Sequence, residues 1–505
     1  MLEPRTHFAG RLASLRQEIR QITTLSLPIL GSQLGFMLLW TVDVAMLGAF
    51  STESLDAAAL GRLWISGTLI FGFGLLLGND PLISQAHGAG DQRSLDLALH
   101  RGLALAGLIS VPLALLWLLT GPVLLVLGQE TALAHEAHRY VMTQIPTLPL
   151  AMAFSALRQF LIGRGIMLPG LYVSLLAVVV NIGANWILIY GHWGAPALGH
   201  VGAGLATAMT QVFMLVALVL FVRVRGLCRF HRLVRSSGAL SLRGLLPVVR
   251  LGLPIALQLG LGTWTFQTTT LMAGWLGRDV LAANTVLLTL SGMAFMVPLA
   301  ISIGTSTRVG HLIGARRPEA ARNAAWASLA LACGVMASLA GLLLLTRAIL
   351  PTLFTNDLHV AALAAAVLPV VAAFQLADGL QAIGGGILRA MGRTRAAAVF
   401  NLAGYYLLAL PLAGWLALHQ GHGLMGIWTG LAIGLTVVAG LLVAWLRRNA
   451  TLAMTLLTPA DPPRDPAPKK AWTPTESSVK PARGELAYPG RFTSLRAKRE
   501  RTWVQ

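Results

Sequence analysis

Residues 22–48 read ITTLSLPILGSQLGFMLLWTVDVAMLG. This stretch is longer than the roughly 20 apolar residues that a helix needs to cross a bilayer. Its only charged residue is Asp43. The segment therefore predicts a membrane-spanning helix that carries one carboxyl group within the apolar layer.

The rest of the chain has the same character. Of its 505 residues, 55% are hydrophobic and 11% are charged, and the mean hydropathy is +0.70. A soluble globular protein carries about 25% charged residues, so a soluble enzyme is excluded. We predict an all-α integral membrane protein with twelve spanning helices. Their expected ranges are 22–48, 56–79, 95–119, 137–162, 170–190, 201–222, 246–276, 281–306, 324–346, 360–387, 397–418 and 424–446.

The sequence offers little for cofactor chemistry. Two cysteines, Cys228 and Cys333, are too few for a disulfide framework or a four-ligand zinc site. The chain has no G-x-x-x-x-G-K-[ST] nucleotide-binding motif. Residues 1–20 are polar and basic, so we expect no cleavable signal peptide. We expect no resident cofactor, and an ion gradient as the energy source.

The chain repeats itself. Leu27-Pro28-Ile29 recurs as Leu253-Pro254-Ile255 at an offset of 226 residues, and Gly88-Ala89 recurs as Gly314-Ala315 at the same offset. Each half holds six predicted helices, an even number, so the two halves have the same orientation in the membrane. A parallel 6+6 repeat around a central cavity is a transporter architecture. The expected domains are an N-terminus (1–21), an N-lobe (22–222), a basic linker (223–245), a C-lobe (246–447) and a disordered tail (448–505).

The basic residues predict the orientation. The formal net charge is +19, with 38 Lys and Arg. We assign only Arg62, Arg139, Arg278 and Arg347 to odd-numbered connections; the others lie in the N-terminus, the even-numbered connections and the tail. The positive-inside rule then places both termini in the cytoplasm. The positive charge is explained by topology and anionic lipid, so membrane lipid is an expected partner and nucleic acid is not.

Most acidic residues lie at helix ends, in connections or in the tail, but Asp43 and Asp378 lie deep within predicted spans, and Asp80, at the end of its span, is a shallower third. A carboxylate in mid-bilayer costs roughly 2.5–3.5 kcal/mol on insertion scales, so such residues are functional candidates. No basic residue lies within one helical turn of Asp43, which predicts an unpaired carboxyl group able to bind a proton or to ligate Na⁺. The alternative for each residue is a structural role, hydrogen-bonded to a neighbouring helix or to freed backbone groups.

Asn181 and Asn185 are four residues apart in a predicted helix, so their amides share one face. Two amides facing the lobe interior can ligate a cation or hold Asp43 in place. The alternative is an ordinary hydrogen bond between helices. We include Gln33 and Thr207 as further candidates for the cavity or the coupling site.

Over roughly residues 20–447 the sequence resembles the multidrug and toxic compound extrusion (MATE) transporters. Six short motifs in order along the chain carry the resemblance: Leu27-Pro28 with Val42-Asp43 and Gly48; Pro81, Gln85 and Gly88-Ala89-Gly90; Asn181 with Asn185; Tyr190-Gly191; Gly314-Ala315; and Asp378 with Leu388-Arg389-Ala390-Met391-Gly392-Arg393. Asn185 stands where another branch of the family has Asp. The resemblance is therefore closer to the NorM-like than to the DinF-like branch.

The resemblance implies an antiporter of the bacterial inner membrane that exports amphipathic, often cationic, compounds in exchange for H⁺ or Na⁺. It implies that Asp43 is the coupling carboxylate and that Asn181 and Asn185 line its site. We expect the protein to act as a monomer on a small-molecule substrate.

The sequence also departs from the family. Gly262 occupies the position of a helix 7 Glu that pairs, in many members, with the residue matching Asp378, so a second-lobe Na⁺ site is in doubt. The main alternative function is a flippase for lipid-linked oligosaccharide or lipid from the same superfamily. Its cavity would be cationic, whereas few basic residues are expected in this membrane interior. An intramembrane enzyme is disfavoured, because the two deep acids lie in different lobes.

Overall fold

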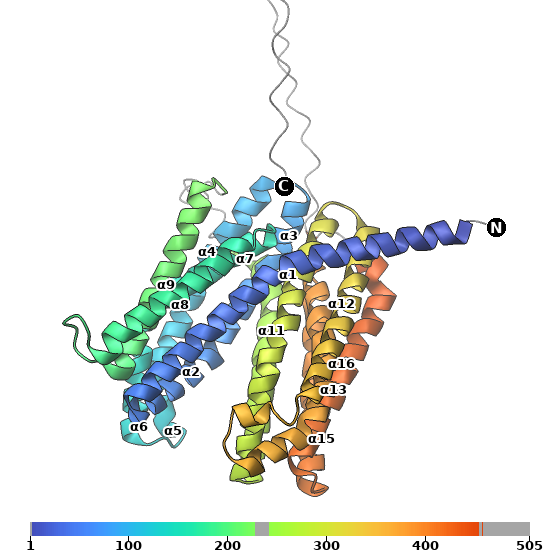
Figure 1. Ribbon diagram of the computed structural model, residues 1–505. Helices are drawn as coiled ribbons and strands as arrows, with labels where there is room; N and C mark the ends of the chain where they lie inside the picture. Colours follow the sequence, from blue (N-terminus) through green and yellow to red (C-terminus); the bar gives the residue numbers. More distant parts are fainter. Residues whose placement is uncertain (1–2, 228–241, 454–456, 458–505) are drawn as a thin grey trace, which may run out of the picture. The chain divides into compact units, whose positions relative to one another are not determined.

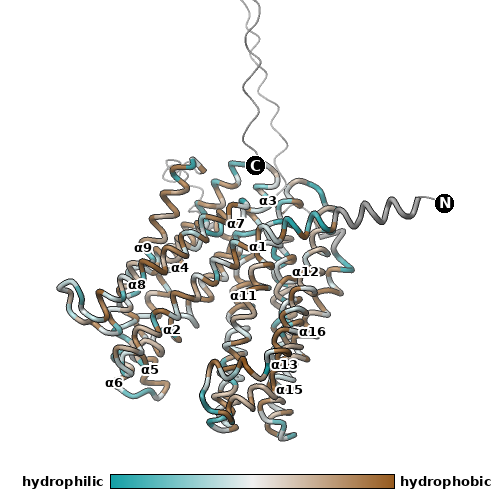
Figure 2. Tube along the Cα trace, in the orientation of Figure 1, coloured by the Kyte–Doolittle hydropathy of each residue, from teal (hydrophilic) through white to brown (hydrophobic). Residues whose placement is uncertain are grey.

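A computed structural model of the protein describes residues 3–227, 242–453 and 457. The described residues are helical with short connections and no strands, and twelve segments are long and apolar enough to span a membrane. The all-α, twelve-helix prediction is confirmed. Hydrophobic residues run along the helices and hydrophilic ones gather at the ends (Figure 2).

The first six spans are built from ten elements. These are α1 (Glu3–Phe50), α2 (Thr52–Leu76), η1 (Leu77–Asn79), α3 (Asp80–Gly88), α4 (Gln92–Leu118), α6 (Thr131–Met142), η2 (Ile145–Thr147), α7 (Leu148–Gly163), α8 (Leu168–Tyr190) and α9 (Gly199–Val224), with the short α5 (Thr120–Val126) after α4. Two spans are interrupted near prolines, at Pro81 and at Pro146. Proline removes a backbone donor and disfavours a continuous α-helix.

The last six spans begin after the linker. They are α10 (Leu242–Trp275), α11 (Arg278–Gly314), α12 (Pro318–Leu345), α13 (Leu358–Ala390), a span composed of α14 (Thr394–Leu402), the π-helical Ala403–Ala409, α15 (Leu410–Gly414) and the π-helical Trp415–His419, and α16 (Gly423–Ala453). Cys333 is an exposed free thiol, whereas Cys228, most of the linker and most of the tail lie outside the described residues.

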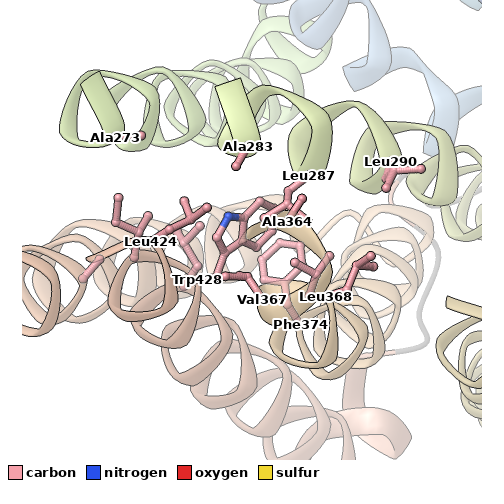
Figure 3. Close-up of a cluster of buried hydrophobic side chains, with 14 of the residues drawn as sticks. Ala273, Ala283, Leu287, Leu290, Ala364, Val367, Leu368, Phe374, Leu424 and Trp428 are labelled. Carbon is pink, nitrogen blue, oxygen red and sulfur yellow. The ribbon is translucent and has the colours of Figure 1, made fainter. Parts of the chain in front are cut away.

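The helices form two bundles, one from each half of the chain, and we keep the names N-lobe and C-lobe for them (Figure 1). Each lobe has its own apolar core. In the C-lobe the core is built around Trp428 and Phe374, whose rings meet edge to face at 5.4 Å (Figure 3). The indole N–H of Trp428 donates to Asn284 Oδ1 at 3.1 Å, so its one polar group is satisfied.

The lobes contact each other through small residues. The missing side chain of Gly74 on α2 leaves room for the backbone of Ala256 on α10, and that of Gly310 on α11 leaves room for Ser84 on α3. Small residues let helix backbones approach closely in membranes. The contacts gather at the end of the bundles where α3 and α11 terminate.

Polar contacts reinforce the same end. Arg308 on α11 binds Glu18 on α1 in a two-pronged ion pair, with N–O distances of 2.7 and 2.8 Å. The Nε2 atom of His311 lies 2.7 Å from the carbonyl oxygen of Gly163. At the end where α1 begins, the lobes are thus joined by close packing, the Glu18–Arg308 ion pair and hydrogen bonds from side chains to backbone carbonyl oxygens.

The glycine contact at this interface can be tested with a matched pair of substitutions in α2. Gly74→Ala places a methyl group against the backbone of Ala256, whereas Gly67 has no atom within 4 Å of an added Cβ. Overpacking costs about 1–3 kcal/mol. We expect Gly74→Ala to lower the melting temperature of the detergent-solubilised protein by several degrees. Gly67→Ala should leave it unchanged or raise it, because alanine favours helix. Equal effects of the two substitutions would contradict this account.

Candidate functional site

Asp43 is positioned by the packing of α1 along α8. Gly31 faces Leu171, and Gly35 faces Ser174 with 2.9 Å between the position of an added Cβ and the Ser174 hydroxyl oxygen. The two helices run in the same direction, so residues in contact differ by a nearly constant amount in residue number. The same difference places Asn185 on α8 beside Asp43 on α1. The Asp43 side chain is buried, as is that of Asn185.

Three polar residues surround this carboxyl group. Asn185 Nδ2 donates to Asp43 Oδ1 at 2.6 Å and to Asn181 Oδ1 at 3.1 Å. Thr207 on α9 donates its hydroxyl to Asp43 Oδ2 at 3.2 Å. The structure thus brings together four residues proposed from the sequence, and we call Asp43, Asn181, Asn185 and Thr207 the N-lobe site.

This site has a fifth member that was not predicted from the sequence. Arg62 Nη1 on α2 lies 3.9 Å from Asp43 Oδ2 and 3.5 Å from the carbonyl oxygen of Trp40. Both charged side chains are less than a tenth exposed. The expectation that Asp43 lacks a basic partner is therefore wrong, and so is the placement of Arg62 in a connection, because it lies within α2. The missed signal was a single basic residue inside an apolar segment.

A buried tyrosine lies beside this ion pair. Tyr140 on α6 interacts electrostatically with both Arg62 and Asp43, and its hydroxyl group pairs with the Gln144 side chain. Gly61 permits the approach, because an added Cβ there would lie 2.7 Å from the Tyr140 ring. Polar groups from α2, α6, α8 and α9 thus interact with Asp43.

Gln33 and Asp80 belong to a different place. Gln33 lies ten residues before Asp43 on α1, a rise of about 15 Å. Its Oε1 atom accepts from Arg158 Nη1 at 3.3 Å. Asp80 is partly buried at the joined end of the lobes, where it interacts electrostatically with Arg158 of the N-lobe and Arg389 of the C-lobe. Basic side chains are therefore more common in the interior than the sequence predicted.

Asp378 lies alone in the C-lobe. It is buried on α13, and its carboxyl group has no hydrogen bond or ion pair with another described residue. Tyr405 interacts with it electrostatically. Gly262 has no atom within 4 Å of an added Cβ, so α10 leaves open space at this position. Within the described residues there is also no group of three or more His, Cys, Asp or Glu able to hold a metal.

The MatE family pattern matches this sequence twice, over residues 28–187 and 254–415. The two matches begin 226 residues apart, which is the offset of the internal repeat. The chain belongs to the MATE family. Its two copies of the pattern cover both lobes and include Asp43, Asn181, Asn185 and Asp378.

Individual relatives agree with this assignment. The chain is 34% identical to the probable multidrug resistance protein NorM of Bradyrhizobium diazoefficiens, across 86% of this chain and 94% of the relative. It is 32% identical to the multidrug resistance protein PmpM of Pseudomonas aeruginosa, across 86% and 92%. This MATE protein is thus a multi-pass membrane transporter of the multidrug efflux type.

Solved structures show the same fold. The eukaryotic MATE transporter AtDTX14 superposes with a TM-score of 0.78 at 24% identity, covering 88% of this chain and all of that one. The bent form of the Vibrio cholerae MATE transporter VcmN gives 0.77 at 20% identity, covering 88% and 99%. The twelve-helix arrangement is therefore that of the MATE fold.

The hydrogen bond between Asn185 and Asp43 predicts a strong effect of truncating the amide. A hydrogen bond to a charged group contributes about 1.5–3 kcal/mol, so we expect Asn185→Ala to reduce efflux about tenfold or more at matched membrane expression. Val179→Ala is a suitable control, since Val179 lies on the same helix and its side chain is exposed. A similar loss in both variants would show that α8 responds to any truncation and that the Asn185–Asp43 bond has no special role.

Proposed function

We propose that this MATE protein exports amphipathic, cationic organic compounds in exchange for H⁺ or Na⁺, and that Asp43 couples the two movements. The observation that carries the proposal is the N-lobe site itself. A carboxyl group inside a membrane is costly, and here Asn185 and Thr207 donate to it from separate helices. Such a group can change its bound cation as the lobe changes conformation.

The arrangement of the lobes supports transport by alternating access. The contacts between them gather at one end, through Gly74, Gly310 and the Glu18–Arg308 ion pair. A rocking motion has to break these contacts to expose the cavity at that end. A parallel repeat about an axis along the membrane normal suits such a motion.

We place the protein in the bacterial inner membrane with both termini in the cytoplasm. The support is the concentration of Lys and Arg in the N-terminus, the linker and the tail. The closed end of the lobes, near α3 and the end of α11, would then face the cytoplasm. In this orientation an ion that enters from outside reaches Asp43 through the opposite half of the cavity.

An ion gradient is a sufficient energy source. One charge that moves through 100 mV contributes about 2.3 kcal/mol, which is close to a fiftyfold concentration ratio. One coupling ion per exported molecule would thus support useful efflux. The relatives named as multidrug resistance proteins favour an organic drug as the exported compound.

A flippase or an exporter of anionic metabolites is the second candidate. The observation that favours it is the buried basic charge, with Arg62 beside Asp43 and with Arg158 and Arg389 around Asp80. The N-lobe site is nevertheless neutral in total charge when Asp43 is ionised. It therefore lacks the excess of positive charge that holds a pyrophosphate group.

Accumulation of ethidium in an efflux-deficient bacterium tests the proposed function. We expect cells that carry the wild-type protein to accumulate less dye than cells with empty vector, and Asp43→Asn to abolish the difference because the coupling charge is lost. Asp56→Asn controls for charge, since Asp56 is exposed on α2. Addition of Na⁺ or of a protonophore assigns the coupling ion.

The same assay tests the role of Asp378 in the C-lobe and the alternative function. Asp378→Asn should have a smaller effect than Asp43→Asn, because Asp378 lacks the polar partners of the N-lobe site. If wild-type and empty-vector cells accumulate the same amount of ethidium, the cationic-drug proposal is withdrawn. A flippase or an exporter of anionic metabolites would then be the favoured function.

A further inference from the structure

We propose that Arg62 is the resident counter-ion of Asp43 and makes the N-lobe site a proton site that rejects Na⁺. This inference rests on the proposed function in taking Asp43 as the coupling group, and it goes further by selecting the ion. It starts from the position of the guanidinium group, 3.9 Å from Asp43 Oδ2 in a buried setting.

The guanidinium group is a permanent charge. Arginine does not lose its proton in proteins, so the pair with ionised Asp43 is neutral and cannot be changed by deprotonating Arg62. Arg62 is also the only Lys or Arg in the span that includes α2 and α3. The positive charge therefore belongs to this site and not to a general basic surface.

The groups that face Asp43 are arranged as donors. Asn185 presents its amide nitrogen at 2.6 Å and Thr207 presents its hydroxyl at 3.2 Å. Two ionisable groups interact with the Asp43 carboxyl group. They are Arg62, which is its charged partner, and Tyr140. A hard metal cation requires a shell of oxygen ligands, whereas this shell directs N–H and O–H groups at the carboxylate.

A Na⁺ ion on Asp43 would meet like charge at close range. The side of the carboxyl group at Oδ2 already faces Arg62, and repulsion between two cations a few ångströms apart is strong where water is excluded. A proton also adds one positive charge beside Arg62, but it forms a covalent bond to one carboxyl oxygen and needs neither the space nor the shell of oxygen ligands that Na⁺ requires. Protonation leaves Asp43 neutral and releases the attraction that holds Arg62 beside it.

Arg62 keeps other partners when this attraction is lost. Its Nη1 atom lies 3.5 Å from the Trp40 carbonyl oxygen, and Tyr140 interacts with it electrostatically. Its Nη2 atom has no hydrogen-bond partner among the described residues, so a new contact can form there. The same repulsion acts on an organic cation. The exported compound would therefore bind elsewhere in the cavity, and Asp43 would serve the proton.

Binding of radioactive sodium to the purified full-length protein in detergent, read by scintillation proximity, tests the inference. We expect the wild type and Arg62→Lys to bind no more Na⁺ than Asp43→Asn. Arg62→Gln, which removes the charge and keeps hydrogen-bonding atoms, should bind at least about tenfold more. The double variant Arg62→Gln/Asp43→Asn should lose this gain. A purely structural role for Arg62 would not create a Na⁺ site.

Several results would overturn the inference. One is Na⁺ binding by the wild type that disappears in Asp43→Asn, and another is an Arg62→Gln variant that folds and binds no Na⁺. If Arg62→Gln does not fold, the proposal is tested by the wild type and Arg62→Lys alone. Na⁺ binding at Asp43 in either protein would contradict it.

A transport measurement separates this inference from the proposed function. In proteoliposomes we expect a pH gradient, but not a Na⁺ gradient, to drive ethidium movement by the wild type. Absence of ethidium movement under both gradients counts against the cationic-drug proposal alone, since the Na⁺-binding assay does not depend on any exported compound. Ethidium movement driven by the Na⁺ gradient counts against the role of Arg62.

Discussion

The burial of one carboxyl group in an apolar membrane segment constrains the N-lobe more than any other interaction. An isolated charge is unfavourable there, so the surrounding helices must supply partners. Asn185 comes from α8, Thr207 from α9 and Arg62 from α2. Each contact fixes the rotation of its helix about its axis. The demand for partners around Asp43 therefore also sets how the helices of the N-lobe pack.

The C-lobe repeats the fold without repeating this constraint. Asp378 is buried on α13, but no comparable set of donors surrounds it, and Gly262 leaves space on α10. The C-lobe has an apolar core around Trp428 and Phe374. Two halves that match the same family pattern thus differ: both have apolar cores, but only the N-lobe gathers hydrogen-bond donors around its deep carboxyl group.

Much of the fold could be predicted from the sequence, because a segment that spans the lipid must be long, apolar and helical. Segment length and hydropathy predict the twelve spans, and the offset between Pro28 and Pro254 predicts the repeat. The spans proved longer than expected, since hydropathy falls at helix ends before the hydrogen-bonded structure does. The first helix, for example, begins at Glu3, well before the apolar stretch.

The site was only partly readable. The spacing of Asn181 and Asn185 predicts a shared face, and the resemblance to MATE transporters links that face to Asp43. Arg62 and Tyr140 could not be placed, because their proximity to Asp43 depends on the packing of α2 and α6 and not on any local pattern. The surroundings of Asp80 could not be predicted for the same reason, because its two basic neighbours come from different lobes.

Gln85 has a consequence for handling this protein in the laboratory. Its amide nitrogen donates to the carbonyl oxygen of Ala390 in the C-lobe at 2.8 Å, and its amide oxygen accepts from the backbone N–H of Leu457 at 3.0 Å. One side chain on α3 thus ties together both lobes and the chain that follows α16. A purification tag or fluorescent fusion attached directly after Leu457 would disturb the hydrogen bonds that Gln85 makes with Ala390 and Leu457. A reporter placed there would alter the conformational balance that it was meant to observe.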